Sequence, residues 1–179
     1  LSPAKGILQA VPQAEANNST RLSIVYGSQT GNARREAEAL QQAAQALGLS
    51  VRLLRADAYP LKELASERLL YVVISTQGEG DPPDDSIAFV EYLSGRRAPK
   101  LNDLYFAVLG LGDSSYPLFN AIANKIDTRL AELGGKRISP VAEADIDIES
   151  IATPWRAKVI EHAREALKTS KPIAHITAL

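Results

Sequence analysis

The chain has 179 residues, a usual size for one domain, and a chain of this length can bury a hydrophobic core without disulfides or metals. Its 20 lysines and arginines balance 21 acids, which argues against a nucleic-acid binder, because such proteins carry a basic excess. The absence of cysteine excludes disulfides and thiolate metal sites, and two histidines, His162 and His175, are too few for a histidine-rich zinc site. The apolar runs are much shorter than the roughly 20 residues that span a bilayer, so we expect no membrane segment.

The first half of the chain alternates between strand-like and helix-like patterns. Residues 21–27 form a short β-branched and aromatic run that ends at a glycine, which predicts a strand. Residues 32–47 place apolar side chains on one stripe of a helix. A strand at 49–54 and a short helix near 61–65 come next. Residues 69–75 are apolar on both faces, which is typical of a strand in a parallel sheet covered by helices.

The second half of the chain continues this alternation. In chain order we expect a helix ended by Gly95, a doubly apolar strand at 104–111, a helix from about Pro117 to the two glycines at 134–135, a weaker strand at 136–141, and a helix from Thr153 to about Leu167. Strands that alternate with helices in this way predict an α/β fold, with an open parallel sheet and helices on both faces. Ligands in such folds bind at the carboxyl ends of the strands.

Both ends of the chain lack a periodic pattern. We therefore interpret residues 1–20 as a flexible linker, residues 21–168 as the folded domain, and residues 169–179, which Pro172 interrupts, as the start of a second linker. The sequence contains no methionine, so we expect a processed chain or a piece of a longer one.

The loop after the first predicted strand has the composition of an anion site. Residues 27–33 place two hydroxyls, an amide and flexible backbone directly before a helix, where free N–H groups and the helix dipole favour an anion. The loop has no lysine and does not fit the P-loop pattern, and it lacks the three glycines of the dinucleotide fingerprint. It suits a phosphate monoester, and the alternative is an ordinary N-capping turn.

The loops after the third and fourth predicted strands are rich in glycine. Residues 75–85 contain two glycines that allow the backbone to approach a flat ligand, with a plain surface turn as the alternative. Residues 110–120 contain Gly110, Gly112 and Tyr116, whose ring either stacks on a planar ligand or packs in the core. Because the three loops converge at one sheet edge, they predict a site for a flat heterocycle with one phosphate, and flavin mononucleotide (FMN) fits best.

Two acidic clusters follow the third and fifth predicted strands. Their members are Glu79, Asp81, Asp84 and Asp85, and Glu143, Asp145, Asp147 and Glu149. Acids of one sign around a site steer a basic partner toward it. The alternative is a pair of solvated acidic runs at helix starts.

Three motifs in this order resemble the FMN-binding loops of the diflavin reductases: SQTGNA at 28–33, STQGEGDPP at 75–83 and LGDSSYPLFN at 111–120. The similarity extends to LAELGGKR at 130–137 and to the helix with Trp155, and covers about residues 21–168. Within this family the chain is most similar to the flavoprotein (alpha) subunits of NADPH-dependent assimilatory sulfite reductases, because cytochrome P450 reductases usually have tyrosine where this chain has Gln77.

The resemblance implies a flavodoxin-like sheet of five strands in the order 2-1-3-4-5. It also implies an electron route from NADPH through FAD to FMN. From FMN the electrons would pass one at a time to a hemoprotein. This chain would hold the FMN step. FAD and NADPH would bind to a reductase domain in the rest of the protein, and the acceptor would be the siroheme iron–sulfur subunit that reduces sulfite to sulfide for cysteine biosynthesis in the cytoplasm. That partner would dock on the acidic rim of Glu79, Asp81, Asp84, Asp85, Asp145 and Asp147.

The resemblance also implies the cofactor-binding residues. The phosphate would be held by Ser28, Gln29, Thr30, Gly31, Asn32 and Ala33. The ring would lie beside Ser75, Thr76, Gln77 and Gly78, with the Gly78 backbone stabilising the one-electron-reduced flavin. The other side would be covered by Leu111, Gly112, Asp113, Ser114, Ser115, Tyr116, Pro117, Leu118, Phe119 and Asn120, with Tyr116 stacked on the ring and Phe119 either shielding it or packing in the core. FMN would perform the redox chemistry, so we expect no catalytic side chain and no metal ligand.

Several other functions compete with this interpretation. A free-standing flavodoxin is the nearest, although such proteins are usually more acidic, and an FMN domain of another diflavin reductase, such as a P450 reductase, is also open. A receiver-type signalling domain needs an aspartate at the end of the third strand, where this chain has Ser75 and Thr76. A hydrolase needs G-x-S-x-G and a histidine base, and the chain offers neither in a loop of the predicted site.

Overall fold

The computed structural model describes residues 20–28 and 30–178, with side chains up to Leu167. Its strands form one parallel sheet with the order β2 (Ser50–Arg55), β1 (Arg21–Gly27), β3 (Leu69–Ser75), β4 (Tyr105–Leu111) and β5 (Lys136–Arg137). A short strand β6 (Ala142–Ala144) also pairs with β4. The predicted strand order 2-1-3-4-5 is therefore confirmed, with one additional strand at the edge.

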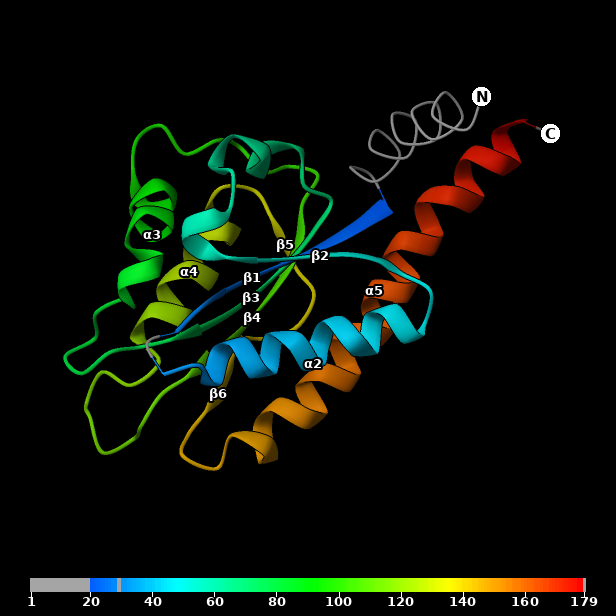
Figure 1. Ribbon diagram of the computed structural model, residues 1–179. Coiled ribbons are helices and arrows are strands. Elements are labelled where there is room, and N and C mark those ends of the chain that lie inside the picture. Colours follow the sequence, from blue (N-terminus) through cyan, green and yellow to red (C-terminus); the bar gives the residue numbers. More distant parts are fainter. Residues whose placement is uncertain (1–19, 29, 179) are drawn as a thin grey trace, which may run out of the picture.

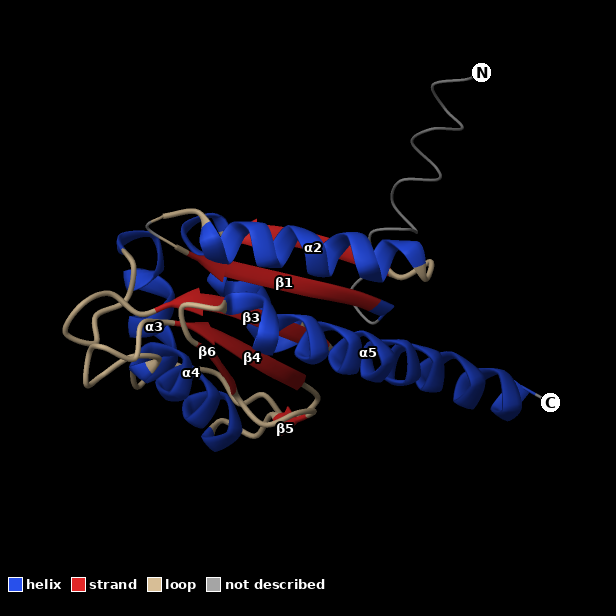
Figure 2. Cartoon of the chain, turned by 90° about the horizontal axis from the view of Figure 1, so that it is seen from below, coloured by secondary structure: helices blue, strands red, loops and turns tan. Residues whose placement is uncertain are grey.

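Two helices cover each face of the sheet. Helices α2 (Asn32–Ala46) and α5 (Ile148–Ala178) lie on one face, and α3 (Ile87–Ser94) and α4 (Ala121–Glu132) lie on the other (Figures 1 and 2). Short 3₁₀ turns occupy Ala56–Ala58, Leu61–Ser66 and Asp84–Ser86. The predicted layered α/β architecture is confirmed, and the predicted short helix near 61–65 is a 3₁₀ turn.

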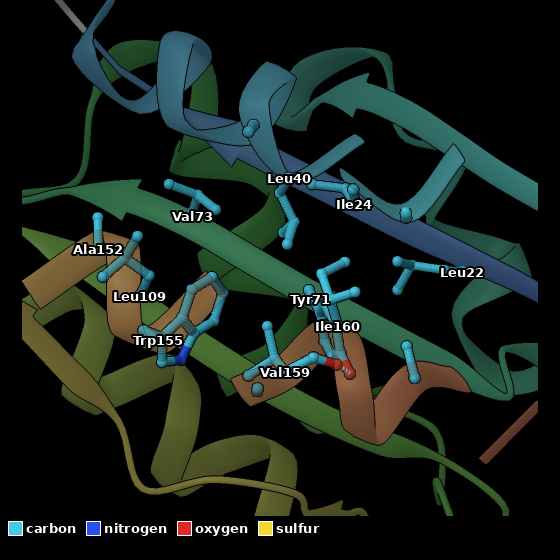
Figure 3. Packing of buried hydrophobic residues seen from close by; sticks show 14 of the residues in the cluster. Leu22, Ile24, Leu40, Tyr71, Val73, Leu109, Ala152, Trp155, Val159 and Ile160 are labelled. Carbon is cyan, nitrogen blue, oxygen red and sulfur yellow. Dashed lines mark hydrogen bonds between the residues drawn. The ribbon is translucent and has the colours of Figure 1, made fainter. Parts of the chain in front are cut away.

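Strand β3 is buried along its whole length because it lies between both helical layers. Its odd-numbered residues Leu69, Tyr71 and Val73 face α2 and α5, while its even-numbered residues face α3 and α4. Figure 3 shows Tyr71 beside Trp155 and Val159 of α5; the Tyr71 hydroxyl donates a hydrogen bond of 2.5 Å to the Val159 carbonyl oxygen. Burial of each large apolar side chain stabilises the fold by about 1.5–3 kcal/mol, so this strand anchors the sheet.

The predicted fifth strand at 136–141 is divided into β5 and β6. The pairing with β4 continues to Ile138, whose N–H donates to the Phe106 carbonyl oxygen at 2.8 Å. Pro140 follows and has no N–H to donate, so the ladder stops and resumes at Ala142. As a result, the chain leaves β6 beside the carboxyl end of β4.

Two predicted helix starts are wrong. Helix α4 begins at Ala121 rather than near Pro117, because Asn120 adopts the left-handed conformation with φ 62° and residues 114–120 form turns and a bend. Helix α5 begins at Ile148 rather than at Thr153. Its apolar face already starts there, since Ile148, Ala152 and Trp155 all pack on the same core. Pro154 is accommodated in the second helical turn.

Helix α5 also continues through Pro172 to Ala178, so the prediction that it ends near Leu167 is wrong. A proline inside a helix removes one backbone hydrogen bond but does not stop the chain from resuming helical angles after it. Residues 1–19, which we interpret as a linker, lie outside the described residues.

A buried ion-pair network lies toward the amino ends of the strands. The Glu67 carboxylate accepts hydrogen bonds from the hydroxyls of Ser23 (2.9 Å) and Tyr59 (2.6 Å) and pairs with Arg52 at 3.0 Å. Arg52 also pairs with Glu63 at 2.7 Å. Burial and the adjacent Glu67 carboxylate raise the pKa of Tyr59 above its usual range. The network ties β1 and β2 to the segment that enters β3.

Candidate functional site

A cavity of about 420 Å³ opens at the carboxyl ends of the strands. This volume is within the range of roughly 300–1,000 Å³ typical of small-molecule sites. Its walls come from the segments that follow β1, β3, β4 and β6. The lining residues are Thr30, Asn32, Ser75, Thr76, Gln77, Gly78, Leu111, Gly112, Asp113, Tyr116, Phe119, Asp145, Ile146 and Ile148.

The loop after β1 forms one end of this cavity, at the N-terminus of α2. The Ser28 hydroxyl accepts hydrogen bonds from the N–H groups of Gly31 (3.0 Å) and Ala33 (3.3 Å), which holds the loop in a tight turn. Gly31 has φ 90°, a left-handed conformation that favours glycine. The first turn of α2 contains no acid, so no side chain of the helix itself opposes the positive end of its dipole. This end of the cavity suits an anion.

Two close contacts fix the first loop against the segment after β3. The Ser28 N–H donates to a carboxylate oxygen of Asp85 at 3.3 Å. A Cβ on Gly27 would lie only 1.8 Å from the Ser86 hydroxyl oxygen, so glycine is required for this approach. Asp85, predicted as a rim acid, therefore also has a structural role.

The loop after β3 is a tight turn closed by two backbone hydrogen bonds. The Gln77 N–H donates to the Asp81 carbonyl oxygen at 2.7 Å, and the Asp81 N–H donates back at 2.9 Å. Gly78 and Gly80 have φ 33° and 97°, which lets the chain reverse between these bonds. A Cβ on Gly78 would meet no atom within 4 Å, so its backbone is open to a ligand on the cavity side.

The loop after β4 is held by carboxylates. Asp113 accepts hydrogen bonds from the Ser115 N–H (2.9 Å) and hydroxyl (2.6 Å). Asp145, which follows β6, accepts from the N–H groups of Ser114 (2.9 Å) and Ile146 (2.8 Å). The hydrogen bonds from Ser114 lower the pKa of Asp145 below its usual range. The carboxylate of Asp145 thus joins the β4 and β6 loops across the cavity.

Two aromatic rings line the cavity. Tyr116 is 48% exposed, and Phe119 is half-buried. The packing of Phe119 is close, since a Cβ on Gly112 would lie 3.2 Å from it. Phe119 therefore both packs on the loop backbone and faces the cavity, and Tyr116 presents a ring to solvent at the mouth.

The cavity brings together most of the predicted site residues, but not all of them. Predicted residues that are described but do not line it are Ser28, Gly31, Ala33, Ser114, Ser115, Pro117, Leu118 and Asn120. Several of these hold the loops: Asn120 is fully buried, and its side-chain amide donates to the Ala144 carbonyl oxygen at 3.3 Å. Gln29 lies outside the described residues.

The sequence interpretation missed two apolar lining residues, Ile146 and Ile148. Ile146 is 76% exposed, which is unusual for so large an apolar side chain. Both alternate with acids after the predicted fifth strand, and isolated isoleucines in an acidic run are the signal that was available. Asp145, predicted only as a rim acid, also lines the cavity. The other predicted rim acids Glu79, Asp81, Asp84 and Asp147 are exposed.

Within the part of the chain that the structure describes, no helix has the length and apolar character needed to cross a membrane. The same residues contain no group of three or more histidine or carboxylate side chains that could hold a metal ion.

Comparisons with known proteins identify flavoproteins as relatives of this chain. The flavodoxin family profile matches residues 24–155. The "Sulfite reductase [NADPH] flavoprotein alpha-component" of Escherichia coli is 44% identical over 174 residues, which cover 97% of this chain and 28% of that protein. The protein of the same name from Salmonella arizonae is 39% identical over 178 residues, and the match covers 30% of that protein. The chain thus spans less than a third of the length of these curated relatives.

Solved structures agree on the fold. A variant of flavodoxin from Pseudomonas aeruginosa is 30% identical, with a TM-score of 0.70, and the match covers 83% of this chain and 99% of that one. A flavodoxin from Streptococcus pneumoniae is 24% identical with a TM-score of 0.68, covering 84% and 99%, and shows the fold alone. The sheet order, the cavity at the carboxyl strand ends and the profile match all agree, and the chain belongs to the flavodoxin family.

Proposed function

We propose that this chain binds FMN and transfers electrons as one module of a longer NADPH-dependent flavoprotein reductase. The observation that supports the proposal most is the convergence of the three predicted loops on one cavity, with the N-terminus of α2 at one side and an aromatic ring at the other. Membership of the flavodoxin family supports the same ligand, because flavodoxin domains bind FMN.

The residues of the cavity fit the two parts of FMN. Thr30 and Asn32 line the cavity beside the N-terminus of α2, where backbone N–H groups would hold the phosphate. Gln77, Gly78 and Tyr116 would border the flat ring, with the open backbone of Gly78 close to it. When bound, FMN supplies the redox chemistry, and the protein residues orient it and limit the access of water.

The exposed edge of the site would serve electron exchange. Tyr116 and Ile146 are exposed at the cavity, so a ring bound between them would remain accessible to another protein. The exposed acids Glu79, Asp81, Asp84 and Asp147 would favour a partner with basic groups.

The curated relatives suggest the electron route. Their name refers to NADPH and sulfite reductase, and this chain corresponds to 28–30% of their length. We infer that FAD and NADPH bind to the remaining part of the full-length protein. We further infer that the acceptor is a siroheme-containing sulfite reductase subunit in the cytoplasm. A free-standing flavodoxin-type carrier is the second candidate, because the match with Pseudomonas aeruginosa flavodoxin covers 99% of that protein.

The first test is the visible absorption spectrum of the purified chain, with identification of the ligand released on denaturation. The expected result is one FMN per chain and an oxidised-flavin spectrum. A protein that is colourless and does not take up added FMN would refute the proposal. Electron transfer from the reduced chain to a sulfite reductase hemoprotein, compared with transfer to a P450, then separates the two acceptor classes.

A further inference from the structure

A second cavity, of about 340 Å³, lies at the opposite end of the sheet. It is formed by the residue that precedes β3, the first residue of β4, strand β5 and the side of α5. It is lined by Arg68, Tyr105, Lys136, Arg137, Ile138, His162, Glu165 and Ala166, so three lysine or arginine side chains share it with one carboxylate, that of Glu165. Tyr105 and Leu111 are the two ends of β4, so at about 3.3 Å per residue the two cavities are roughly 20 Å apart.

Two cationic side chains converge on one aromatic ring in this second cavity. The guanidinium carbon of Arg68 lies 5.1 Å from the centroid of the Tyr105 ring, and the Lys136 ammonium nitrogen lies 5.4 Å from it. Neither cation forms an ion pair with a carboxylate of the described residues. Arg137 differs, because it pairs with Asp127 at 2.8 Å.

The Arg68 guanidinium forms no hydrogen bond or ion pair with the described residues. Its Nε atom is buried and has no hydrogen-bond partner among the described residues. The Nε atoms of Arg21 and Arg52 are closed off in the same way, so a ligand in the cavity would contact the terminal N–H groups of Arg68, for which a charge-assisted hydrogen bond to an anion is the strongest partner. The Arg68 guanidinium also lies over the Tyr105 ring, a cation–π contact that favours this position of the side chain.

We propose that this second cavity is a binding site for an oxyanion, a phosphate or carboxylate group, separate from the FMN site. Arg68 would bind two oxygens of the anion, and Lys136 would neutralise the remaining charge. Tyr105, Ile138 and Ala166 provide an apolar wall for the part of the ligand attached to the anion. The group can belong to a free phosphorylated compound or to an acidic stretch of polypeptide, and both sources share this chemistry.

The experiment uses the FMN-saturated protein, so that the phosphate-binding loop at α2 is occupied. Pyrophosphate and, separately, a peptide of six glutamates are titrated, and the backbone amide signals of Tyr105, Lys136 and Arg137 are followed by NMR. The expected result is a saturable shift of these signals that weakens with added salt. Tighter binding of pyrophosphate identifies a free oxyanion as the source, and tighter binding of the peptide identifies an acidic segment.

Variants distinguish this site from general charge attraction. Arg68→Gln is expected to weaken binding by about tenfold or more, because it removes a charged two-point contact. Lys136→Gln, at an exposed side chain, tests the same site if Arg68→Gln does not fold. Arg96→Gln is the matched control, since Arg96 is an exposed arginine elsewhere on the surface. The proposal is overturned if neither probe gives a saturable shift, or if Arg96→Gln weakens binding as much as Arg68→Gln.

Discussion

At the scale of single residues, the candidate site separates side chains that hold loops from side chains that face the cavity. Ser28 and Asn120 belong to the similarity motifs, yet their side chains form hydrogen bonds within the protein. Thr76 lines the cavity, but its hydroxyl also accepts the Ile122 N–H at 3.1 Å. Tyr116, in contrast, is exposed and free to contact a ligand. A residue in a binding motif therefore does not necessarily touch the ligand.

The role of Tyr116 can be tested by substitution. Tyr116→Ala is expected to weaken FMN binding by about tenfold, because stacking contributes about 0.5–1.5 kcal/mol beyond the area it buries. Tyr116→Phe keeps the ring and should bind like the original chain. The measurement is a titration of FMN-free protein followed by quenching of flavin fluorescence. Equal affinity of the alanine and phenylalanine variants would show that the ring does not stack.

Asp145 gives a prediction about pH. Its pKa is lowered by the hydrogen bonds from Ser114, so this contact is fully present above the ordinary aspartate value of about 3.9 and is lost as the pH falls through the lowered value. We expect the amide NMR signals of Ser114 and Ile146 to move together below that pH. Asp145→Asn should abolish the transition while the loop stays folded. Unchanged signals down to the acid unfolding of the protein would contradict the assignment.

At the scale of elements, close backbone approaches set the geometry of the cavity. Gly27 ends β1 against Ser86, and Gly110 near the end of β4 lies against α4, where a Cβ would be 2.5 Å from both Ala123 and Asn120. These contacts determine how near the loops come to one another. They follow from the positions of helices that the sequence motif does not contain.

Gly27→Ala tests this argument. The added methyl group would overlap the Ser86 hydroxyl, so we expect the free energy of unfolding to fall by about 1–3 kcal/mol. Combining it with Ser86→Ala removes the overlapping oxygen, and the two changes together should cost less than the sum of the single ones. Urea denaturation of the four proteins measures the coupling. Additive losses would mean that the Cβ is accommodated elsewhere.

At the scale of the whole molecule, one end of the sheet forms the candidate ligand site and the other contributes to stability. The carboxyl ends hold the candidate FMN cavity, while the Glu67 network lies toward the amino ends, where both carboxylate oxygens of Glu67 have partners. A buried carboxylate with these partners stabilises the fold without contacting the cavity. Stability and ligand binding should therefore be separable by substitution.

Glu67→Gln tests this separation. Breaking a buried ion pair costs roughly 3–5 kcal/mol, and we expect the lower end because Arg52 keeps its contact with Glu63. The FMN affinity of the folded protein should not change. Glu38→Gln is the matched control, since its pair with Arg34 is exposed and contributes less than about 1 kcal/mol. Urea denaturation and FMN titration of both variants measure the two effects, and a parallel loss of affinity would refute the separation.

The residues of β1 to β4, to within one position, and the loops that meet at the cavity could be predicted from the sequence, and the strand order followed from the resemblance to the diflavin reductases. The division of the predicted fifth strand into β5 and β6 could not. Apolar runs such as residues 69–75 encode burial on both faces, and the three motifs encode the turns after β1, β3 and β4. Both signals are local, because they depend on side-chain periodicity and on turn-forming residues within a few positions.

Other features were decided only by tertiary structure. The start of α5 depends on Ile148 packing against a core built from distant strands, and the presence of Ile146 in the cavity depends on where β6 pairs with β4. The convergence of Arg68 and Lys136 on Tyr105 joins residues that are far apart in the chain. Local sequence determines which elements form. Long-range packing determines where they begin and which side chains meet, because those contacts exist only once the layers are assembled.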